Sequence, residues 1–176
     1  LPVASTGNLC VPRWLRLHIP PRILELIMAE PKDAVALLKA DHRIVEDLFA
    51  SFEKASGDGR KQKIAEEICK ELTIHTKLEE EIFYPAVKLA LKDKELIPEA
   101  TVEHSTLKDL IAQVEGIEPD GEMFDAKIKV MSEYVKHHVK EEQNEIFSKA
   151  KTTDIDFVKL GSQMATRKAE LLAARG

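Results

Sequence analysis

Cysteine, glycine and aromatic residues are scarce in this chain of 176 residues, which contains two cysteines, seven glycines and 5% aromatics. So few cysteines argue against a disulfide framework and for a reducing compartment, so we expect a cytoplasmic protein. Few glycines and aromatics, with long stretches rich in Ala, Glu, Lys and Leu, favour helices over a sheet. Cys69, inside a predicted helix, is interpreted as a small apolar residue near the core.

Two kinds of partner are also disfavoured by what the sequence lacks. No apolar run approaches the roughly 18 residues needed to cross a bilayer, so we predict no membrane partner. The net charge is −5, lysines and glutamates are interspersed, and no base-reading motif is present, so we predict no nucleic-acid partner. An apolar content of 44% over 176 residues is enough for one domain with a core, as a monomer or a homodimer.

The first part of the chain differs in charge from the rest. Residues 1–27 contain three arginines and one glutamate, a net charge of +2, whereas the remainder carries −7. Two interpretations stay open: an Arg-rich targeting leader, or upstream sequence before a true start at Met28, which we favour. We therefore divide the chain into a leader, residues 1–30, irregular or short helical, and a bundle domain, residues 31–176.

Beyond Pro31 the sequence indicates helices separated by short breakers. Pro85 should bend one helix, because it removes an intrahelical donor, and Asp154 is the expected N-cap of the last helix. Short connections place successive helices antiparallel. The sequence thus predicts an all-α fold, an antiparallel up-down-up-down four-helix bundle with an extra C-terminal helix, with helices at residues 32–56, 60–91, 99–115, 121–151 and 155–174.

The sequence contains an internal repeat that carries histidines. At an offset of 62 residues, DHRIVEDLFASFE at 41–53 matches EHSTLKDLIAQVE at 103–115. At an offset of 63, HTKLEEEIFYP at 75–85 matches HVKEEQNEIFS at 138–148. Each unit is therefore one helix with a single His, followed by one helix with an HxxxE pair. Two units of equal build predict a bundle with pseudo-twofold symmetry.

Helical phase places the repeated polar residues in the core. On the helix at 60–91, His75 and Glu79 share one inward stripe with Ile82 and Ala86. The other three helices of the bundle give matching stripes around their own polar residues. The six candidate site residues at core positions are His42, His75, Glu79, His104, His138 and Glu142.

Acidic side chains in an apolar interior need strong partners. An unpaired buried carboxylate costs several kcal/mol, and a pair of cations compensates this cost far better than imidazoles alone. Because carboxylates can bridge two metals while imidazoles take terminal positions, the six residues predict a two-metal centre. The alternative is a metal-free hydrogen-bonded network of the same residues.

Several neighbours of these residues have less defined expectations. His137 lies about 100° round the helix from the stripe, so we expect a solvated or outer-shell role for it. Asp41 and Glu103 each precede a histidine and are either outer-shell carboxylates or solvated helix acids. Glu80 is expected to face solvent or the outer shell, and Tyr84 to pack at the end of the bundle.

The order His, HxxxE, His, HxxxE over about residues 32–151 resembles the HHE-type hemerythrin-like family, and its bacterial members more than the oxygen carriers of marine worms. The resemblance implies a non-haem centre of two iron ions, with terminal histidines and with Glu79 and Glu142 as bridges. The ligand types alone also fit manganese or zinc. Those carriers have a further His where this chain has Lys108, and HxxxxD where it has Glu142 and Gln143, which argues against reversible oxygen carriage.

Three functions stay open on these residues. The first, which we favour, is a protein that binds or senses iron together with a small ligand such as oxygen or nitric oxide. The second is a di-iron redox enzyme acting on peroxide or nitric oxide, and the third is a metal-free structural bundle. We place the enzyme second because neither a dedicated substrate pocket nor an electron-transfer partner can be read from the sequence.

Overall fold

The computed structural model describes residues 33–115 and 121–174, and every regular element in those ranges is helical. The expected leader, residues 1–30, and the proposed start at Met28 lie outside the described residues. In chain order, the α-helices and two π-helical turns (η) are α2 (Ala34–Glu53), α3 (Asp58–Leu78), η2 (Glu79–Phe83), α4 (Tyr84–Leu91), α5 (Leu96–Glu115), α6 (Glu122–Glu141), η3 (Glu142–Ile146), α7 (Phe147–Ala150) and α8 (Phe157–Ala173).

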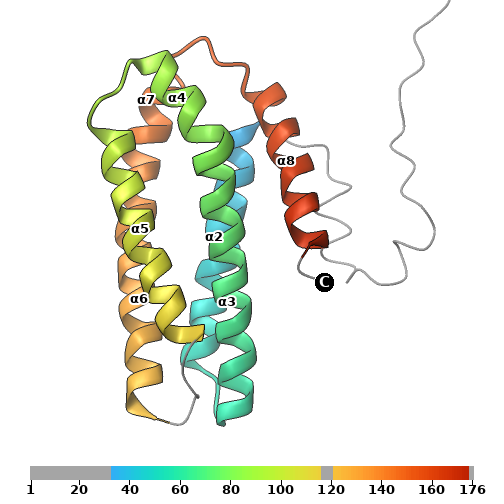
Figure 1. Cartoon of the computed structure of the whole chain (residues 1–176), viewed down its shortest axis with the longest axis vertical. Helices are drawn as coiled ribbons and strands as arrows, with labels where there is room; N and C mark the ends of the chain where they lie inside the picture. Colours follow the sequence, from blue (N-terminus) through green and yellow to red (C-terminus); the bar gives the residue numbers. More distant parts are fainter. Residues whose placement is uncertain (1–32, 116–120, 175–176) are drawn as a thin grey trace, which may run out of the picture. The chain divides into compact units, whose positions relative to one another are not determined.

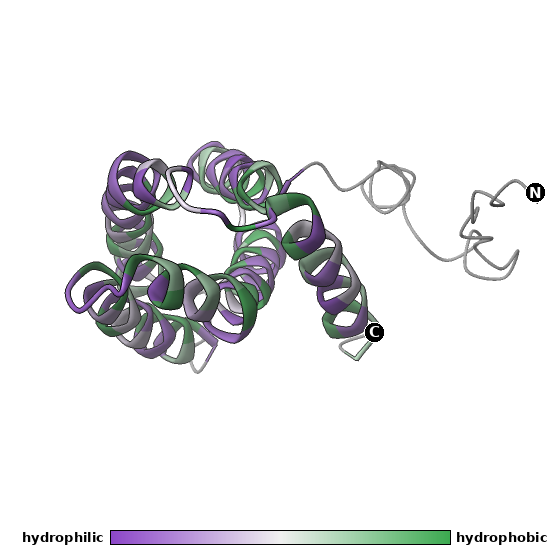
Figure 2. Ribbon diagram, turned by 90° about the horizontal axis from the view of Figure 1, so that it is seen from above, coloured by the Kyte–Doolittle hydropathy of each residue, from purple (hydrophilic) through white to green (hydrophobic). Residues whose placement is uncertain are grey.

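Four long helical columns form the bundle, and α8 stands outside it (Figure 1). One column consists of α3, η2 and α4, another of α6, η3 and α7, and α2 and α5 are the remaining two. Seen from above, the columns surround one centre, and α8 packs against α2 and α3 (Figure 2). The predicted all-α four-helix bundle with an extra C-terminal helix is therefore confirmed.

Acidic side chains cap three of the helices, because each helix begins with backbone N–H groups that have no partner within it. Asp33 accepts a hydrogen bond from the first turn of α2 at 2.8 Å, and Asp93 accepts one from the first turn of α5 at 2.8 Å. The expected cap at Asp154 is wrong by two residues. It is the side chain of Asp156 that accepts from the first turn of α8, at 2.9 Å, so α8 begins later than predicted.

The two longest predicted helices, at 60–91 and 121–151, are each interrupted by a π-helical turn. Each turn begins at the glutamate of an HxxxE pair, Glu79 in η2 and Glu142 in η3. The backbone N–H that follows each turn donates to the carbonyl of that glutamate, five residues back instead of four. Such turns are rare and are frequently found at functional sites, so their position points to the same region that the sequence singled out.

The extra residue in η2 rotates the helix that follows it. The stripe predicted from regular spacing is therefore wrong after Glu79: Ile82 and Ala86 are only half-buried, while Phe83 and Val87 are fully buried. Just before Pro85, where a bend was expected, the helix changes register. Pro85 then lies in the first turn of α4, where its missing N–H costs little.

Two apolar clusters fill the bundle, one on each side of a polar layer. One cluster contains Leu38 and Phe83 together with Met164 from α8, and the other contains Phe49 and the buried Cys69. Burying a large apolar side chain contributes about 1.5–3 kcal/mol, so both clusters stabilise the columns. No helix in the described ranges combines the length and the apolar character needed to cross a membrane.

Candidate metal centre

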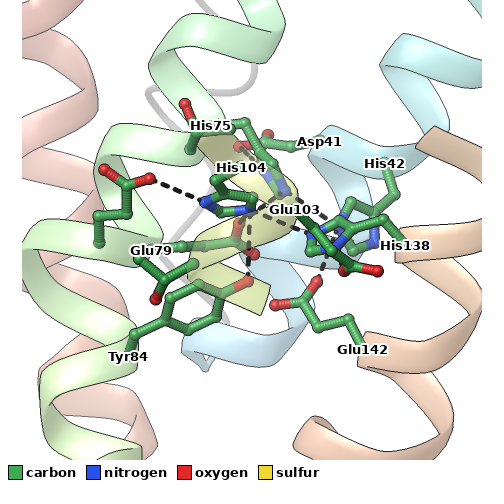
Figure 3. Close-up of polar contacts among 12 residues, drawn as sticks. Asp41, His42, His75, Glu79, Tyr84, Glu103, His104, His138 and Glu142 are labelled. Atoms are coloured by element: carbon green, nitrogen blue, oxygen red, sulfur yellow. Dashed lines mark hydrogen bonds and ion pairs between the residues drawn. The ribbon is translucent and has the colours of Figure 1, made fainter. Parts of the chain in front are cut away.

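Six polar side chains meet in the layer between the two apolar clusters (Figure 3). All six are buried, and none exposes more than 5% of its surface. The structure thus brings together every candidate site residue that the sequence singled out, whereas their role as metal ligands stays a prediction. Their elements are α2 for His42, α3 for His75, η2 for Glu79, α5 for His104, α6 for His138 and η3 for Glu142.

The four histidines form two pairs. The Nε2 atoms of His42 and His75 lie 3.1 Å apart, and so do those of His104 and His138. Glu79 links the pairs, because its Oε2 atom lies 3.2 Å from Nε2 of His75 and 3.3 Å from Nε2 of His104. The donor atoms fall into two groups that could each hold a cation: one group is His42, His75, Glu79 and Glu142, and the other is Glu79, His104 and His138.

The carboxylates of Glu79 and Glu142 test whether metal ions fit here. Glu142 Oε2 lies 3.2 Å from His42 Nε2. Neither this contact nor the contacts of Glu79 with His75 and His104 have hydrogen-bond geometry. All four carboxylate oxygens are therefore buried without a hydrogen-bond partner. Orphaned buried carboxylates cost several kcal/mol, and cations gripped by nitrogen and oxygen donors remove that cost. This donor set suits iron, manganese or zinc, so the residues present fit a pair of metal ions.

Each histidine also has a polar neighbour at its other ring nitrogen. In the second pair, Glu103 Oε2 lies 2.6 Å from His138 Nδ1, and Glu80 Oε1 lies 3.1 Å from His104 Nδ1. A carboxylate at Nδ1 fixes the ring orientation and makes Nε2 a stronger donor to a metal. Of the two alternatives left open for Glu103, the solvated helix acid is therefore wrong, because Glu103 bonds to His138.

The first pair has the same arrangement with weaker contacts. Gln143 Nε2 lies 3.3 Å from His42 Nδ1, and Asp41 Oδ2 lies 3.8 Å from His75 Nδ1. With its amide turned so that Oε1 accepts from Nδ1–H, Gln143 leaves Nε2 of His42 free for a cation. All four neighbours are adjacent in sequence to a candidate ligand, so the repeat sets the surroundings of the histidines as well as the histidines themselves.

A comparison with known families matches the bundle columns and all six site residues. The family described as hemerythrin HHE cation binding domain matches residues 33–150, about two thirds of the chain. The chain belongs to the hemerythrin HHE cation-binding family. The resemblance drawn from the doubled His and HxxxE pattern is thereby confirmed.

Two relatives are similar to different shares of this chain. A solved hemerythrin HHE cation binding domain-containing protein from Mycobacterium kansasii has a TM-score of 0.70 and 23% identity, covering 81% of this chain and 89% of that chain. At this identity it shows the shared fold. A protein named DNA nickase from Nostoc sp. is 28% identical over 112 residues, which are 64% of this chain and 32% of the relative. This chain thus spans about a third of that relative's length.

The buried groups of the HHE centre perturb one another strongly when no metal is bound. Burial lowers the pKa of His42 to about 3, and the neighbouring His75 acts in the same direction. Burial also opposes charge on His75, but Glu79 and Asp41 outweigh it and raise the pKa of His75 to about 10. Burial, reinforced by the Glu79 charge, raises the pKa of Glu142 well above its ordinary value. Metal ions at this centre must therefore displace protons.

Two aromatic rings cover the histidines at matching positions of the HHE repeat. The Tyr84 ring stacks on His104 at 5.3 Å between centroids, and the Phe147 ring stacks on His42 at 6.0 Å. The hydroxyl of Tyr84 lies 3.4 Å from Nε2 of His104, and burial raises the pKa of this phenol well above its usual value. The expectation of simple packing for Tyr84 missed this hydroxyl. The sequence contains one indication of this role: Tyr84 carries a hydroxyl at the position where the second repeat has Phe147.

A small cavity lies beside the histidines. Its volume is about 10 Å³. A single water needs roughly 10–15 Å³, so the HHE centre has room for one very small molecule. Besides the four histidines, the lining residues are Val45, Leu72, Thr76, Leu107, Val135 and Val139.

Two further residues lie near the centre, His137, which the sequence analysis discussed, and Lys168, which it did not. His137 exposes 62% of its side chain and pairs with Glu141 at 3.2 Å, so of the solvated and outer-shell roles expected for His137 the structure favours the solvated one. Sequence reasoning missed Lys168 of α8, whose Nζ atom lies 2.6 Å from Asp41 Oδ1. No pattern in the sequence points to Lys168, because α8 lies outside the repeat.

Proposed function

We propose that this HHE domain binds two metal ions, iron in view of its family, and with them binds or senses a small ligand such as oxygen or nitric oxide. The observation that carries the proposal is the set of four buried carboxylate oxygens without hydrogen-bond partners, which face the Nε2 atoms of four histidines. In this proposal His42 and His75 would hold one ion, His104 and His138 would hold the other, and the carboxylates of Glu79 and Glu142 would be shared between the two ions.

Iron bound there would supply a redox-active Lewis acid that can take up a small molecule. The chain itself contributes three things. The polar neighbours at the Nδ1 atoms orient the histidine rings, the apolar clusters on both sides exclude water, and the cavity of about 10 Å³ limits the size of a ligand. These features support a centre that selects its ligand by size.

Elemental analysis after anaerobic reconstitution with ferrous iron and removal of free metal tests the proposal. We expect about two ions per chain, as in other bundles with paired carboxylate ligands. Glu79→Gln should reduce this number, because it removes a bridging carboxylate. His137→Ala is the matched control and should keep it, since His137 is solvated. A folded protein that retains almost no iron, manganese or zinc would exclude the proposed centre.

An optical spectrum recorded first under nitrogen and then in air identifies the metal and the ligand chemistry. New visible bands in air support iron and an oxygen-reactive centre. A metal-loaded protein with a featureless spectrum under both conditions indicates zinc or divalent manganese, which elemental analysis distinguishes, and rules out the oxygen part of the proposal. Addition of nitric oxide to the ferrous protein tests the other ligand in the same way.

Nucleic acid is a further partner to test because of the name of the Nostoc relative. The chain spans about a third of that relative, and its net charge is −5, so we keep the prediction that it does not bind nucleic acid. Fluorescence anisotropy with a labelled DNA duplex at low salt measures this directly, and saturable, salt-sensitive binding would contradict it.

Cytoplasmic location and a monomeric or homodimeric state also stay predictions.

A further inference from the structure

The two halves of the centre differ at the carboxylate that precedes the single histidine of each half. In one half, Glu103 Oε2 lies 2.6 Å from His138 Nδ1 and forms a hydrogen bond with it. At the corresponding place in the other half, Asp41 Oδ2 lies 3.8 Å from His75 Nδ1, which is too long for a hydrogen bond. Both of these atoms are buried without a hydrogen-bond partner. A ring nitrogen and a carboxylate oxygen thus face each other without bonding.

A lysine from outside the four-helix bundle pairs with the carboxylate in this half and is largely buried, whereas the exposed Lys108 of the other half pairs with Glu80, which keeps its contact with His104. Lys168 of α8 places its Nζ atom 2.6 Å from the other oxygen of Asp41, and the Lys168 side chain is only 15% exposed. Within the described ranges, Glu103 has no Lys or Arg within ion-pair distance. A hydrogen bond between two charged groups is stronger than one to the neutral imidazole that His75 would be with a metal ion at its Nε2 atom. Lys168 therefore competes with His75 for the carboxylate of Asp41.

We propose that Lys168 is a positioning residue that holds Asp41 away from His75 and thereby weakens His75 as a metal ligand. This inference rests on the proposed two-metal function. A histidine that donates its Nδ1–H to a carboxylate binds metal more tightly through Nε2, and loss of such a partner typically costs about 10–100-fold in metal affinity. The packing of α8 against α2 and α3 then sets how tightly one of the two ions is held.

Titration with zinc against a competing chromophoric chelator measures the two metal affinities separately, and zinc keeps the protein diamagnetic for NMR. In Lys168→Met, Asp41 is free to turn to His75, so we expect one of the two zinc affinities to rise by about 10-fold. Lys168→Arg keeps the cation and should behave like the native protein. Arg167→Met is the matched control on α8, because Arg167 pairs with the surface residues Glu81 and Glu170.

Two carboxylate variants in the native background provide a test that does not depend on the folding of Lys168→Met, and one of them repeated in the Lys168→Met background measures the coupling. Glu103→Gln should lower one zinc affinity by about 10–100-fold, because Glu103 bonds directly to His138. Asp41→Asn in the native background should change the zinc affinities by less than about 3-fold, since Asp41 makes no such bond. In the Lys168→Met background, Asp41→Asn should cost as much as Glu103→Gln, which is the coupling expected of residues that share a partner.

The proton NMR spectrum of the zinc-loaded protein supplies a readout that general destabilisation would not produce. The Nδ1–H resonance of His75 should shift downfield in Lys168→Met and stay unshifted in Arg167→Met. Equal losses for Asp41→Asn and Glu103→Gln in the native background, or unchanged zinc affinities in a folded Lys168→Met, would overturn the inference. Failure of the native protein to bind zinc or iron at all would instead exclude the proposed two-metal function.

Discussion

Replacing Glu142 by Met should stabilise the metal-free protein, although it removes a predicted metal ligand. Both Glu142 oxygens are buried without a hydrogen-bond partner, and the residue is 1% exposed. Each orphaned buried polar atom costs about 1–3 kcal/mol, and Met has a flexible side chain of similar length without that cost. Burial and the Glu79 charge raise the pKa of Glu142 well above its ordinary value, which favours the neutral acid over the costlier charged form, so the lower end of this range applies.

The expected gain for Glu142→Met is therefore about 2 kcal/mol for the two oxygens together. In a chain of this size, 1 kcal/mol shifts Tm by about 2–4 °C, so Tm in the presence of a chelator should rise by about 4–8 °C. The native protein should respond in the opposite way to metal. Free metal at 100 times Kd contributes about 2.7 kcal/mol per site, which raises Tm by about 5–11 °C, and the variant should lose much of this increment.

Thermal unfolding followed by circular dichroism, with chelator and with ferrous iron under nitrogen, measures both effects on the same samples. Glu141→Met is the matched control, because the Glu141 side chain is 45% exposed and surface changes usually stay within about 0.5 kcal/mol. Glu142→Gln keeps the shape and guards against overpacking by Met. A lower Tm for both Glu142 variants in chelator would show that this carboxylate stabilises the fold without metal, which refutes the reasoning.

Three further predictions follow from the geometry. His138→Ala should halve the number of bound metal ions measured by elemental analysis, whereas His137→Ala should leave it unchanged, because only His138 lies in the core stripe. Gln143→Glu should tighten one metal affinity by about 10-fold and Glu80→Gln should weaken the other by about 10–100-fold, as read by chelator competition. In chelator, the pKa of His75 is raised to about 10 by neighbouring carboxylates that outweigh burial. The stability contributed by its charge is present below pH 6.5 and lost as the pH rises towards 10, so urea unfolding should show decreasing stability over that interval.

The candidate site could be predicted almost completely because it depends on local helical phase. Residues three and four apart share a helix face, so His75 and Glu79 must point the same way wherever the helix packs. The repeat then fixes that two such faces exist and that each is matched by a single-histidine helix. The roles of Asp41 and Glu103 were left open because each directly precedes a candidate ligand. Helical phase alone does not decide whether such a side chain faces solvent or contacts a histidine.

The change of register after each HxxxE pair could not be predicted in the same way. A π-helical turn adds one residue to a turn, and the sequence around Glu79 contains apolar residues at both of the alternative positions, Ile82 and Phe83. Regular spacing selects Ile82, whereas the structure buries Phe83 against the Phe147 ring at 5.5 Å between centroids. That contact joins two columns, so the choice is made by tertiary packing rather than by the local pattern.

The differences between the halves matter more for this chain than the features they share. Gln143 is a neutral neighbour where the other half has a carboxylate, and Asp41 is held by Lys168 at 2.6 Å, so both weakened contacts belong to the His42–His75 pair. The Tyr84 hydroxyl lies at the other pair. Two ions bound here would therefore meet unequal surroundings: one with weaker histidine donors, and the other with strong donors and a phenol beside it. The repeat supplies two similar candidate metal positions. Gln143, the Tyr84 hydroxyl and Lys168, which comes from a helix outside the repeat, make the surroundings of those positions chemically distinct.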